Sequence, residues 1–555
     1  MKEQSTEESK LDPFEGIGLC FSGGGYRATF FSLGVVSYLE RIQFKGSSLL
    51  DRTLAVSSVS GGTLLAVAYS RAVCSPEYDF KTFYREFYNQ FKPDTDTLLS
   101  DAMKKLEDQS TWVKFAYKKQ SIINAFALTY AEMDIFKGGF DVYKNTNNTQ
   151  LKEVCFNSTE FSFGLPFRFQ NSGIFGNSPL RSPNSEALKY SIQLGDIVAS
   201  SSCFPLGFEP LIFPNDYFSD QSTEAFKALK KEEYFEDGIG IMDGGIADNQ
   251  GIESMLNITR RKAMNNKFNL LIVNDVASYK MVPWSEDKTP IRNRKSLRTT
   301  FRSLLGYLKV KPIYWILLLA GVLLMLLNAG QVFSDQEYVW PYVTGGILTG
   351  MGIVLIVLGA ILASVKKEGS DWLESMVKGN VPEVLLNDVI SFQNLEIGLI
   401  KRMLTERLTS GAKMINDVFL KQIRRLNYNV LYNEENFDNK RITSTVYQLN
   451  GEKTPYGNNS FNKKITPTPS KELTKTALIA SQTPTTLWWD EKDKEANRMD
   501  SLIACGQFTT CYNLLDYVTD IRSQGYDSSE LQELENVLRA DWKKFNEQPL
   551  NHVNP

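Results

Sequence analysis

The sequence predicts an α/β protein with an inserted pair of apolar helices and a helical C-terminal region. In the first half of the chain, short apolar segments are followed by glycine-rich turns and by helically spaced apolar residues, a pattern typical of strand–turn–helix units in an α/β sheet. Two uncharged stretches in the middle are long enough to cross a bilayer. Beyond them, apolar residues recur with the period of amphipathic helices.

The individual elements follow from this pattern. Four short buried strands are predicted at residues 16–22, 53–57, 238–242 and 269–273, and three helices at residues 27–42, 63–73 and 252–264. Residues 94–200 are rich in aromatic side chains and give no clear element. Residues 451–486 are rich in Thr, Pro, Ser and Lys, and we expect them to form a long loop.

Composition excludes several classes of function. The chain has 555 residues, of which 42% are hydrophobic, so it can bury a large core in more than one structural unit. Its net charge of −3 gives no overall attraction to nucleic acid, and no nucleic-acid partner is expected. Six scattered cysteines without a Cys-x-x-Cys pair indicate buried thiols rather than a zinc site or disulfides. The charged N-terminus, residues 1–12, lacks the apolar core of a secretory signal, so a cytoplasmic fold is expected.

The only histidine is His552. It lies in a C-terminal tail that we expect to be mobile. Catalysis must then proceed without a histidine base, which argues against a Ser-His-Asp triad and against histidine-ligated zinc or iron. No metal and no cofactor are expected.

The two uncharged stretches are residues 312–333 and 342–365. At about 1.5 Å per residue, each can span a bilayer core of roughly 30 Å. The loop between them contains Asp335 and Glu337 but no Lys or Arg, whereas lysines flank the pair at positions 309, 311, 366 and 367. This distribution predicts a two-pass hairpin with both flanks and both termini in the cytoplasm. Two buried helices of a soluble core are the alternative.

Residues 281–311 are predicted to form a basic juxtamembrane segment. From residue 288 onward, Lys and Arg side chains alternate with Leu and Phe and no acidic residue occurs, as in amphipathic helices that lie on anionic headgroups. A solvated basic linker is the alternative. In the second apolar stretch, Gly346-x-x-x-Gly350 permits close helix approach, so a homo-oligomer through the hairpin is a further hypothesis.

Ser60 is the candidate nucleophile. It lies between a predicted strand and a predicted helix, where a nucleophile elbow holds its serine. Gly61 and Gly62 are small enough for such a turn, and Ser58 stands where the usual G-x-S-x-G pattern has glycine. The N-terminus of the following helix would face a developing oxyanion. An ordinary strand-to-helix turn could give the same pattern.

Two further motifs complete a candidate site. Gly23-Gly24-Gly25 follows the first strand, and successive glycines allow backbone amides to converge as in an oxyanion hole. A dinucleotide fingerprint also fits these glycines, but the acidic residue that it requires after the second strand is absent. Asp243 ends a predicted strand before two glycines, and without histidine it is the plausible base for Ser60. Asp237 and Asp248 compete, although Asp248 looks more like a helix cap.

The glycine loop, the Ser60 turn and Asp243-Gly244-Gly245, in this order, resemble the patatin-like phospholipase family over residues 14–278. The segment Ala199–Pro205 is also similar to that family. The resemblance implies a three-layer α/β/α fold and a histidine-free Ser60–Asp243 dyad. It further implies an oxyanion hole made by the amides of Gly23, Gly24 and Gly25 and shaped by Arg27. The resulting organisation is a flexible N-terminus (1–12), a catalytic core (13–280), the basic segment (281–311), the hairpin (312–365) and a helical C-terminal region packing on the core (366–555).

The resemblance implies a lipid acyl hydrolase. Ser60 would attack the acyl carbonyl while Asp243 takes its proton, and water would then release the acyl group. The expected substrate is a phospholipid or lysophospholipid, which a membrane anchor presents at high effective concentration. Two alternatives remain: a catalytically inactive membrane adaptor with the same fold, and an acyltransferase that uses the same dyad.

Overall fold

The computed structural model describes residues 12–146, 149–278, 284–285, 312–332, 338–358, 395–452, 465 and 467–554. The chain forms two compact units: the first comprises Met1–Val282 and Met414–Pro555, and the second comprises Pro283–Lys413. The predicted N-terminal segment (1–12) and the predicted basic segment (281–311) lie largely outside the described residues. Residues 359–394, which include the end of the predicted hairpin and the start of the predicted C-terminal region, also lie outside them.

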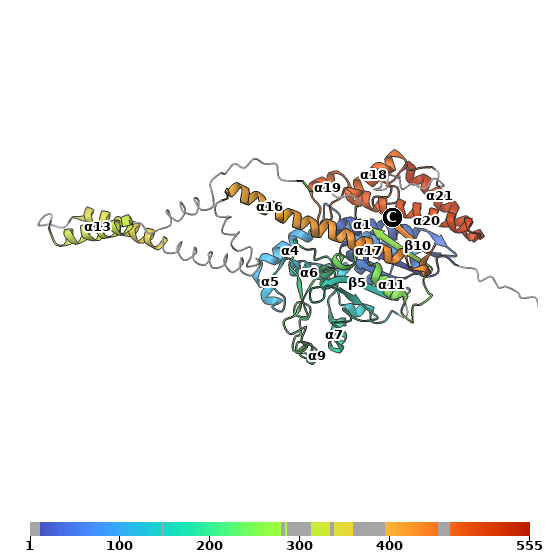
Figure 1. The fold of residues 1–555 in the computed structure, drawn as a ribbon, viewed down its shortest axis with the longest axis horizontal. Coiled ribbons are helices and arrows are strands. Elements are labelled where there is room, and N and C mark those ends of the chain that lie inside the picture. The colour runs from blue at the N-terminus through green and yellow to red at the C-terminus, as the bar shows by residue number, and fades with distance from the viewer. Residues whose placement is uncertain are drawn as a thin grey trace, which may run out of the picture. The chain divides into compact units, whose positions relative to one another are not determined.

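An eight-stranded sheet forms the centre of the first unit (Figure 1). Its strand order is β10-β9-β1-β4-β5-β8-β7, with β6 paired to β5. The strands from β10 to β5 are parallel, whereas β6 and β8 run antiparallel to β5 and β7 runs antiparallel to β8. Their bounds are β1 Ile17–Phe21, β4 Thr53–Val59, β5 Glu153–Glu160, β6 Pro166–Gln170, β7 Leu211–Phe213, β8 Ile239–Asp243, β9 Leu270–Asp275 and β10 Arg441–Thr445.

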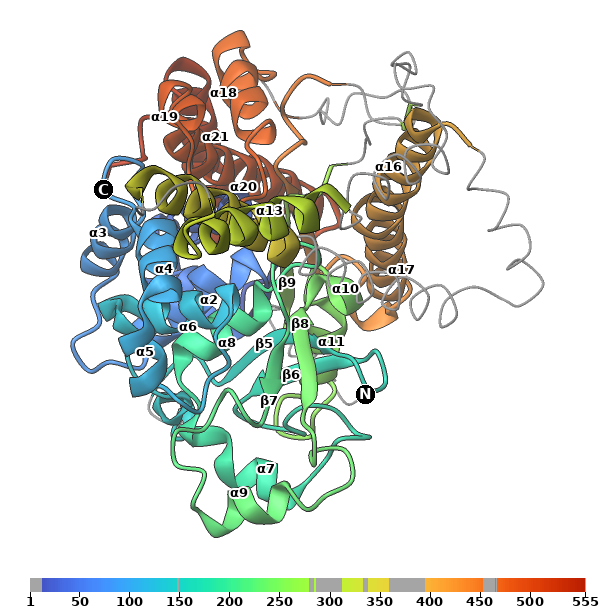
Figure 2. The same cartoon turned by 90° about the vertical axis from the view of Figure 1, so that its left-hand side faces the viewer.

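Alternating side chains of the sheet pack into two separate hydrophobic cores, one on each face. Leu19 belongs to one core and its neighbour Cys20 to the other, and Val56 and Ala55 divide in the same way. Figure 2 shows α2 (Gly61–Val73), α6 (Ile122–Glu132) and α8 (Leu194–Ser201) on one side of the sheet. The other side carries α10 (Gly245–Asp248), α11 (Ile252–Thr259) and α17 (Leu420–Tyr432). The predicted three-layer α/β/α class is therefore confirmed.

The C-terminal region is built into this unit. Helix α20 (Arg498–Ser523) crosses α1 (Gly25–Arg41) so closely that a Cβ at Gly34 would lie 2.0 Å from the carbonyl oxygen of Ile503. Strand β10 extends the parallel sheet beyond β9. Helix α21 (Ser529–Glu547) is tied to α1 by an ion pair between Arg41 and Asp541 at 3.2 Å. The last helices and the edge strand thus pack on the same sheet as the motifs near the N-terminus.

The loop predicted at residues 451–486 is wrong in part, because it contains helix α18 (Lys471–Ser481). The Ser470 side chain accepts the amide hydrogen of Leu473 at 3.1 Å and caps this helix. Leu473, Ala477 and Ala480 then bury one face of it. The sequence analysis missed this helix because residues 451–486 as a whole are rich in polar residues.

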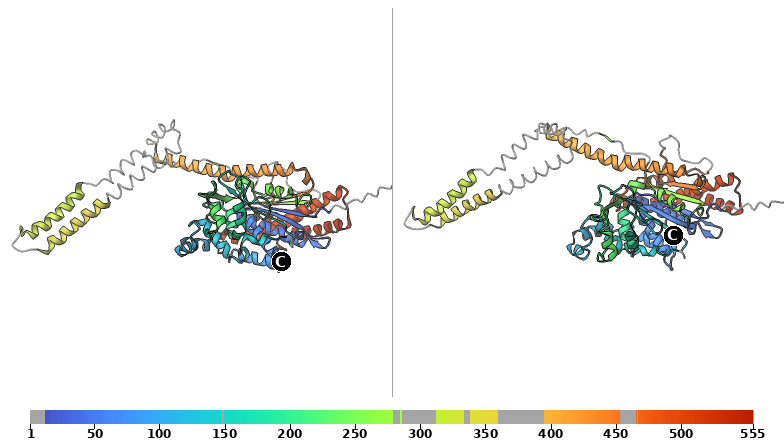
Figure 3. Two further views of the ribbon diagram at one scale, coloured as in Figure 1. Left: turned by 90° about the horizontal axis from the view of Figure 1, so that it is seen from below. Right: turned by 60° about the horizontal axis from the view of Figure 1, so that its bottom comes forward.

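The second unit contains two helices that are long and apolar enough to cross a membrane, α13 (Pro312–Ala329) and the helix Val339–Leu358. Their mean hydropathies are 2.1 and 1.9. They lie side by side (Figure 3), and a Cβ at Gly321 or Gly352 would meet the opposite helix at 2.5 or 2.8 Å. The Asn328 side chain bonds both the N–H and the C=O of Tyr338, at 3.2 and 2.9 Å, and so closes the hairpin. Helix α16 (Ile397–Lys413) completes the described part of this unit.

Candidate active site

Ser60 occupies a sharp turn between β4, which ends at Val59, and α2, which begins at Gly61. Its backbone has φ 50° and ψ −126°, a conformation that non-glycine residues rarely adopt. A Cβ at Gly61 would lie 2.0 Å from the carbonyl oxygen of Gly25, and one at Gly62 would lie 2.7 Å from that of Phe21. Only glycine fits at these two positions, and Ser60 is held at the tip of the turn.

Ser58 fits where the usual motif has glycine because its hydroxyl has a partner. The residue is fully buried, and its Oγ lies 2.9 Å from Oγ1 of Thr63 on the first turn of α2. Thr63 Oγ1 lies 2.8 Å from Oγ of Ser201 at the end of α8. The extra hydroxyl therefore joins the strand before the turn to the helix after it.

Ser201 holds the backbone of the nucleophile. Its Oγ accepts the N–H of Ser60 at 2.9 Å and donates to the carbonyl oxygen of Asn157 at 2.7 Å. The same segment holds the aspartate loop, because the N–H of Asp243 donates to Cys203 O at 3.0 Å. The segment that resembles the family between serine and aspartate thus links the two candidate catalytic residues.

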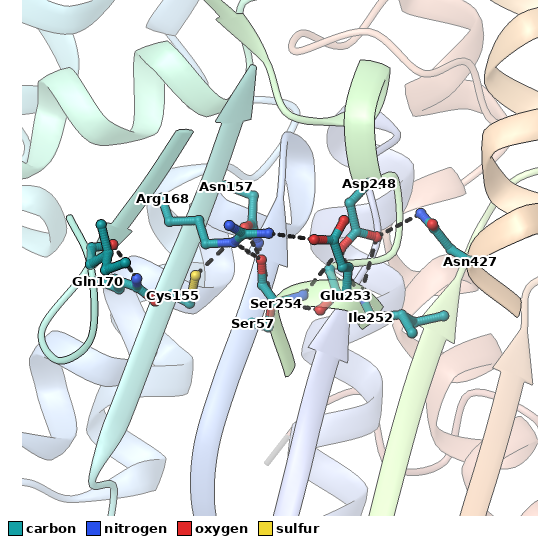
Figure 4. A network of polar contacts seen from close by, with 12 residues as sticks. Ser57, Cys155, Asn157, Arg168, Gln170, Asp248, Ile252, Glu253, Ser254 and Asn427 are labelled. Atoms are coloured by element: carbon teal, nitrogen blue, oxygen red, sulfur yellow. Dashed lines mark hydrogen bonds and ion pairs between the residues drawn. The ribbon is translucent and has the colours of Figure 1, made fainter. Parts of the chain in front are cut away.

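Asn157, on β5, supports the turn from the other side and lies in the polar network of Figure 4. Its Nδ2 donates to Ser57 Oγ at 3.1 Å and to Ser58 O at 3.0 Å. Its Oδ1 accepts the hydroxyl of Ser254 at 2.7 Å, and Ser254 Oγ in turn accepts from Arg168 Nε at 2.7 Å. These contacts fix the strand that precedes the nucleophile. Sequence analysis missed Asn157, since nothing in its local pattern marks it.

Asp248 lies at the other end of this network and acts as a helix cap, as the sequence indicated. It accepts the N–H groups of Ile252 at 3.1 Å and Glu253 at 2.9 Å at the start of α11. It also accepts Nδ2 of Asn427 from α17 at 2.9 Å (Figure 4). Burial raises the pKa of Asp248 to about 6.

Sheet register places Asp243 level with Ser60. Val59 pairs with Asn157, and Asp243 pairs with the next residue of β5, Ser158. Ser60 and Asp243 therefore lie on either side of β5, and both line one cavity of about 620 Å³. Burial raises the pKa of Asp243 to about 6, while hydrogen bonds from the Ser60 side chain and the Gly245 N–H act in the opposite direction. The carboxyl group is mostly ionised at neutral pH.

The glycine loop lines the same cavity. The N–H of Gly23 donates to the carbonyl oxygen of Asn249 at 2.9 Å. Gly24 and Gly25 have φ values of 139° and 54°, which favour glycine. Within the residues that the structure describes, the N–H groups of Gly24 and Gly25 have no acceptor in the protein. Two amides of the loop are thus available to a ligand in the cavity.

Arg27 connects the glycine loop to the C-terminal region. Its Nη1 donates to the hydroxyl of Tyr447 at 2.9 Å and to the carbonyl oxygen of Thr483 at 3.1 Å. Burial lowers the pKa of Arg27. Nearby, the N–H of Tyr26 donates to Thr486 O at 2.8 Å. Residues more than 400 positions later in the chain thus fix the loop that follows β1.

The C-terminal region also supplies part of the cavity wall. Arg424 on α17 lines the cavity, and its Nε donates to Asp275 at the end of β9, at 2.5 Å. Sequence analysis missed this contribution because no local motif marks it. The C-terminal residues that line the cavity are Asp417, Leu420, Lys421, Arg424, Tyr447, Thr485, Thr486 and Leu487.

The prediction of a mobile C-terminal tail is wrong. Gln507 Nε2 donates to the carbonyl oxygen of His552 at 2.7 Å, and the Tyr84 hydroxyl donates to that of Val553 at 2.5 Å. The imidazole packs edge-on against Phe545 with ring centroids 5.3 Å apart. His552 is not among the residues that line the Ser60 cavity. Among the described residues, no group of three or more His, Cys, Asp or Glu side chains could hold a metal ion.

Comparison with known families agrees with this geometry. Residues 19–256 match the family model of patatin-like phospholipases. The match begins in β1, ends in α11, and includes the glycine loop, Ser60 and Asp243. Residues 19–256 therefore form a patatin-like phospholipase domain. A search of curated proteins finds no match to the chain.

Proposed function

We propose that the protein is a serine lipid acyl hydrolase that uses Ser60 and Asp243 and is anchored to a membrane by its hairpin. One observation carries most of the proposal. A serine on a strained turn, a buried aspartate with a raised pKa and two N–H groups without acceptors in the described protein, those of Gly24 and Gly25, belong to residues that line one cavity. These groups are the nucleophile, base and oxyanion donors that acyl transfer requires.

The proposed reaction has two halves. Ser60 Oγ attacks the acyl carbonyl carbon as its proton passes to Asp243, and the N–H groups of Gly24 and Gly25 stabilise the oxyanion. The leaving alcohol takes the proton from Asp243, and an acyl-enzyme remains. Water then attacks this ester as its proton passes to Asp243, and Asp243 returns the proton to Ser60 Oγ as the fatty acid leaves. A base with a pKa of about 6 suits this exchange near neutral pH.

The proposed substrate is a phospholipid or lysophospholipid of the membrane that holds the hairpin. The family match supports a lipid substrate, and two helices of suitable length and hydropathy support the anchor. Lysines on both flanks and none in the intervening loop support a two-pass topology with the catalytic unit and both termini in the cytoplasm.

The hairpin also supports self-association. Gly321 and Gly352 are occupied by contacts inside the hairpin, whereas a Cβ at Gly346 or Gly350 would meet no described atom within 4 Å. The helix face that carries Gly346 and Gly350 is therefore open to a helix of another copy. Crosslinking in detergent should trap dimers of the wild type and fewer of Gly350→Leu. Equal yields from both would remove this part of the proposal.

Covalent labelling tests the chemistry. Full-length protein in mild detergent is incubated with a fluorophosphonate probe, and the modified peptide is identified by mass spectrometry. We expect the label on Ser60 in the wild type and none in Ser60→Ala of equal thermal stability. A folded wild type without any label would instead support the inactive adaptor. Adding an alcohol acceptor and analysing the products separates hydrolysis from acyl transfer.

A further inference from the structure

Among the large apolar side chains that the first unit exposes to solvent, five belong to the loops that follow β5 and α8 and that precede β8. Phe161, Phe163 and Leu165 follow β5 directly, and Leu206 and Tyr234 belong to two other loops. Phe161 is 55% exposed and Leu206 is 72% exposed. We refer to these five residues as the apolar rim. Water contact of so many large apolar side chains is unfavourable, and such patches mark interaction sites.

The loop that carries three of them has a defined structure. The side chain of Glu160 is completely buried beneath it and accepts three backbone N–H groups of the loop: Ser162 at 2.6 Å, Phe163 at 3.0 Å and Leu165 at 3.1 Å. A buried carboxylate requires such partners, so the loop conformation is fixed from within. The hydrogen bonds to Glu160 therefore hold Phe161, Phe163 and Leu165 in their exposed positions.

Two of the rim residues are in direct contact, and the loops that carry the others approach one another around Gly240. The rings of Phe163 and Tyr234 meet edge to face with centroids 5.2 Å apart. The N–H of Phe161 donates to Gly240 O at 3.1 Å. A Cβ at Gly240 would lie 3.0 Å from the Phe161 ring and 3.5 Å from Pro210, which ends the loop that carries Leu206.

The rim adjoins the Ser60 cavity. Phe204 and Pro205 line that cavity, and Leu206 is the next residue. Leu206 has a φ of 68°, so an unfavourable backbone conformation presents an apolar side chain to water. On the other loop, Phe161 lies three residues along β5 from Ser158, the partner of Asp243. At about 3.3 Å per residue, this is roughly 10 Å from the level of the dyad.

We propose that the apolar rim inserts into the surface of a lipid bilayer and presents the adjoining cavity to the membrane. The inference rests on the proposed function, in which the unit hydrolyses lipid and is tethered by the hairpin. Residues 276–311 connect β9 to α13, and a chain of that length spans at most about 130 Å. The first unit therefore stays within reach of the bilayer that holds the hairpin, at high effective concentration.

The chemistry of the rim fits a lipid surface. Phenylalanine, tyrosine and leucine partition into the interfacial layer of bilayers, and the rim contains no charged side chain. Insertion should therefore persist at high salt and on zwitterionic lipid, unlike the electrostatic adsorption expected for a basic segment.

The first experiment compares two substrates. Full-length protein is reconstituted into phosphatidylcholine vesicles, and hydrolysis of the vesicle lipid is compared with hydrolysis of a water-soluble short-chain ester. The double variant Phe163→Asp and Leu206→Asp should lose at least about tenfold on vesicle lipid and less than about twofold on the soluble ester. Val537→Asp is the matched control, because Val537 is a 43% exposed valine on α21, outside the rim. Equal vesicle activity of the double variant and the control would overturn the proposal.

A second measurement does not depend on activity. An environment-sensitive dye on Leu206→Cys in the same vesicles should shift its emission to the blue, and nitroxide-labelled lipid should quench it, in 1 M salt as in low salt. The same dye on Val537→Cys should stay in water. If the dye at position 206 shows neither the blue shift nor the quenching on vesicles, lipid insertion is refuted. The apolar rim would then be a binding site for a protein partner. If the wild type hydrolyses neither substrate while the dye inserts, the proposed hydrolase fails and the rim proposal stands.

Discussion

Replacing Asp243 with asparagine should abolish turnover and, at neutral pH, stabilise the folded protein. The two effects have one cause. The carboxylate is buried beside Ser60, where it can accept the serine proton but where its charge is poorly solvated. Asparagine keeps the shape and can still accept the Gly245 N–H that Asp243 Oδ1 accepts at 2.7 Å. It cannot accept a proton from Ser60.

The pKa of Asp243 gives the size of the stability effect. It rises from 3.8 to about 6 on folding, and each unit corresponds to about 1.4 kcal/mol. The folded state thus binds this proton more tightly than the unfolded state, so wild-type stability declines, relative to the variant, as the pH rises from about 4 to about 7. Asp243→Asn should exceed the wild type in free energy of unfolding by up to about 3 kcal/mol above pH 7, and by much less at pH 4. Loss of the base should lower kcat at least about 10²-fold.

Ester hydrolysis and thermal unfolding at pH 7.5 and pH 4 measure both effects on the same detergent-purified protein. Wild-type kcat/KM should also fall as the pH drops below about 6, where Asp243 becomes protonated. Asp237→Asn is the matched control, because Asp237 is exposed just before β8, and it should change neither quantity. The reasoning would be refuted if Asp243→Asn kept a tenth of the wild-type activity. It would also be refuted if the variant's gain in free energy of unfolding over the wild type were smaller at pH 7.5 than at pH 4.

Three further predictions concern the surroundings of the dyad. Ser201→Ala removes the acceptor of the Ser60 N–H and should cost about 1–3 kcal/mol of stability and lower kcat; unchanged unfolding and activity would show that this bond is dispensable. His552→Ala should leave hydrolysis within about twofold of the wild type, since the imidazole lies outside the cavity lining; inactivation would contradict the histidine-free site. Deleting residues 312–365 should release the protein from carbonate-washed membranes, because the described residues contain no other helix of that length and hydropathy; retention there would contradict the anchor.

The parallel strands near the N-terminus were predictable because their signals are local. Apolar runs followed by glycines identified β1 and β4. The predicted Ser60 turn lies between β4 and α2, and the crowded backbone there requires the glycines that the sequence has at positions 61 and 62. The α/β class and the patatin-like domain over residues 19–256 were confirmed for the same reason. The pairing of Asp243 with Ser158 was not predictable, since it depends on the register of a strand that the sequence did not reveal.

Strand β5 shows why that strand was missed. All eight of its residues are buried, although Glu153, Asn157 and Glu160 are polar. Glu153 pairs with Arg261 at 2.6 Å, and Glu160 accepts backbone N–H groups of the following loop. These partners satisfy the buried groups, but one lies more than 100 positions away. A polar segment with distant partners gives no strand signal in the sequence.

The C-terminal region was unpredictable for a related reason. The short strand β10 contains one apolar residue, Ile442, and its place is fixed by pairing with Ile272 of β9. Once β10 is in the sheet, Tyr447 reaches Arg27 and the cavity gains its C-terminal wall. Neither the pairing nor the wall can be inferred from local pattern, because both depend on contacts between segments separated by the hairpin.

Lipid mass spectrometry tests the central proposal most directly. Vesicles of defined phospholipid and lysophospholipid are incubated with equal amounts of folded wild type and Ser60→Ala, and all acyl products are quantified over time. The wild type should release fatty acid together with a stoichiometric amount of deacylated lipid, and Ser60→Ala should release at least about 10³-fold less. Equal release by both proteins, or none by a folded wild type, would contradict catalysis by Ser60.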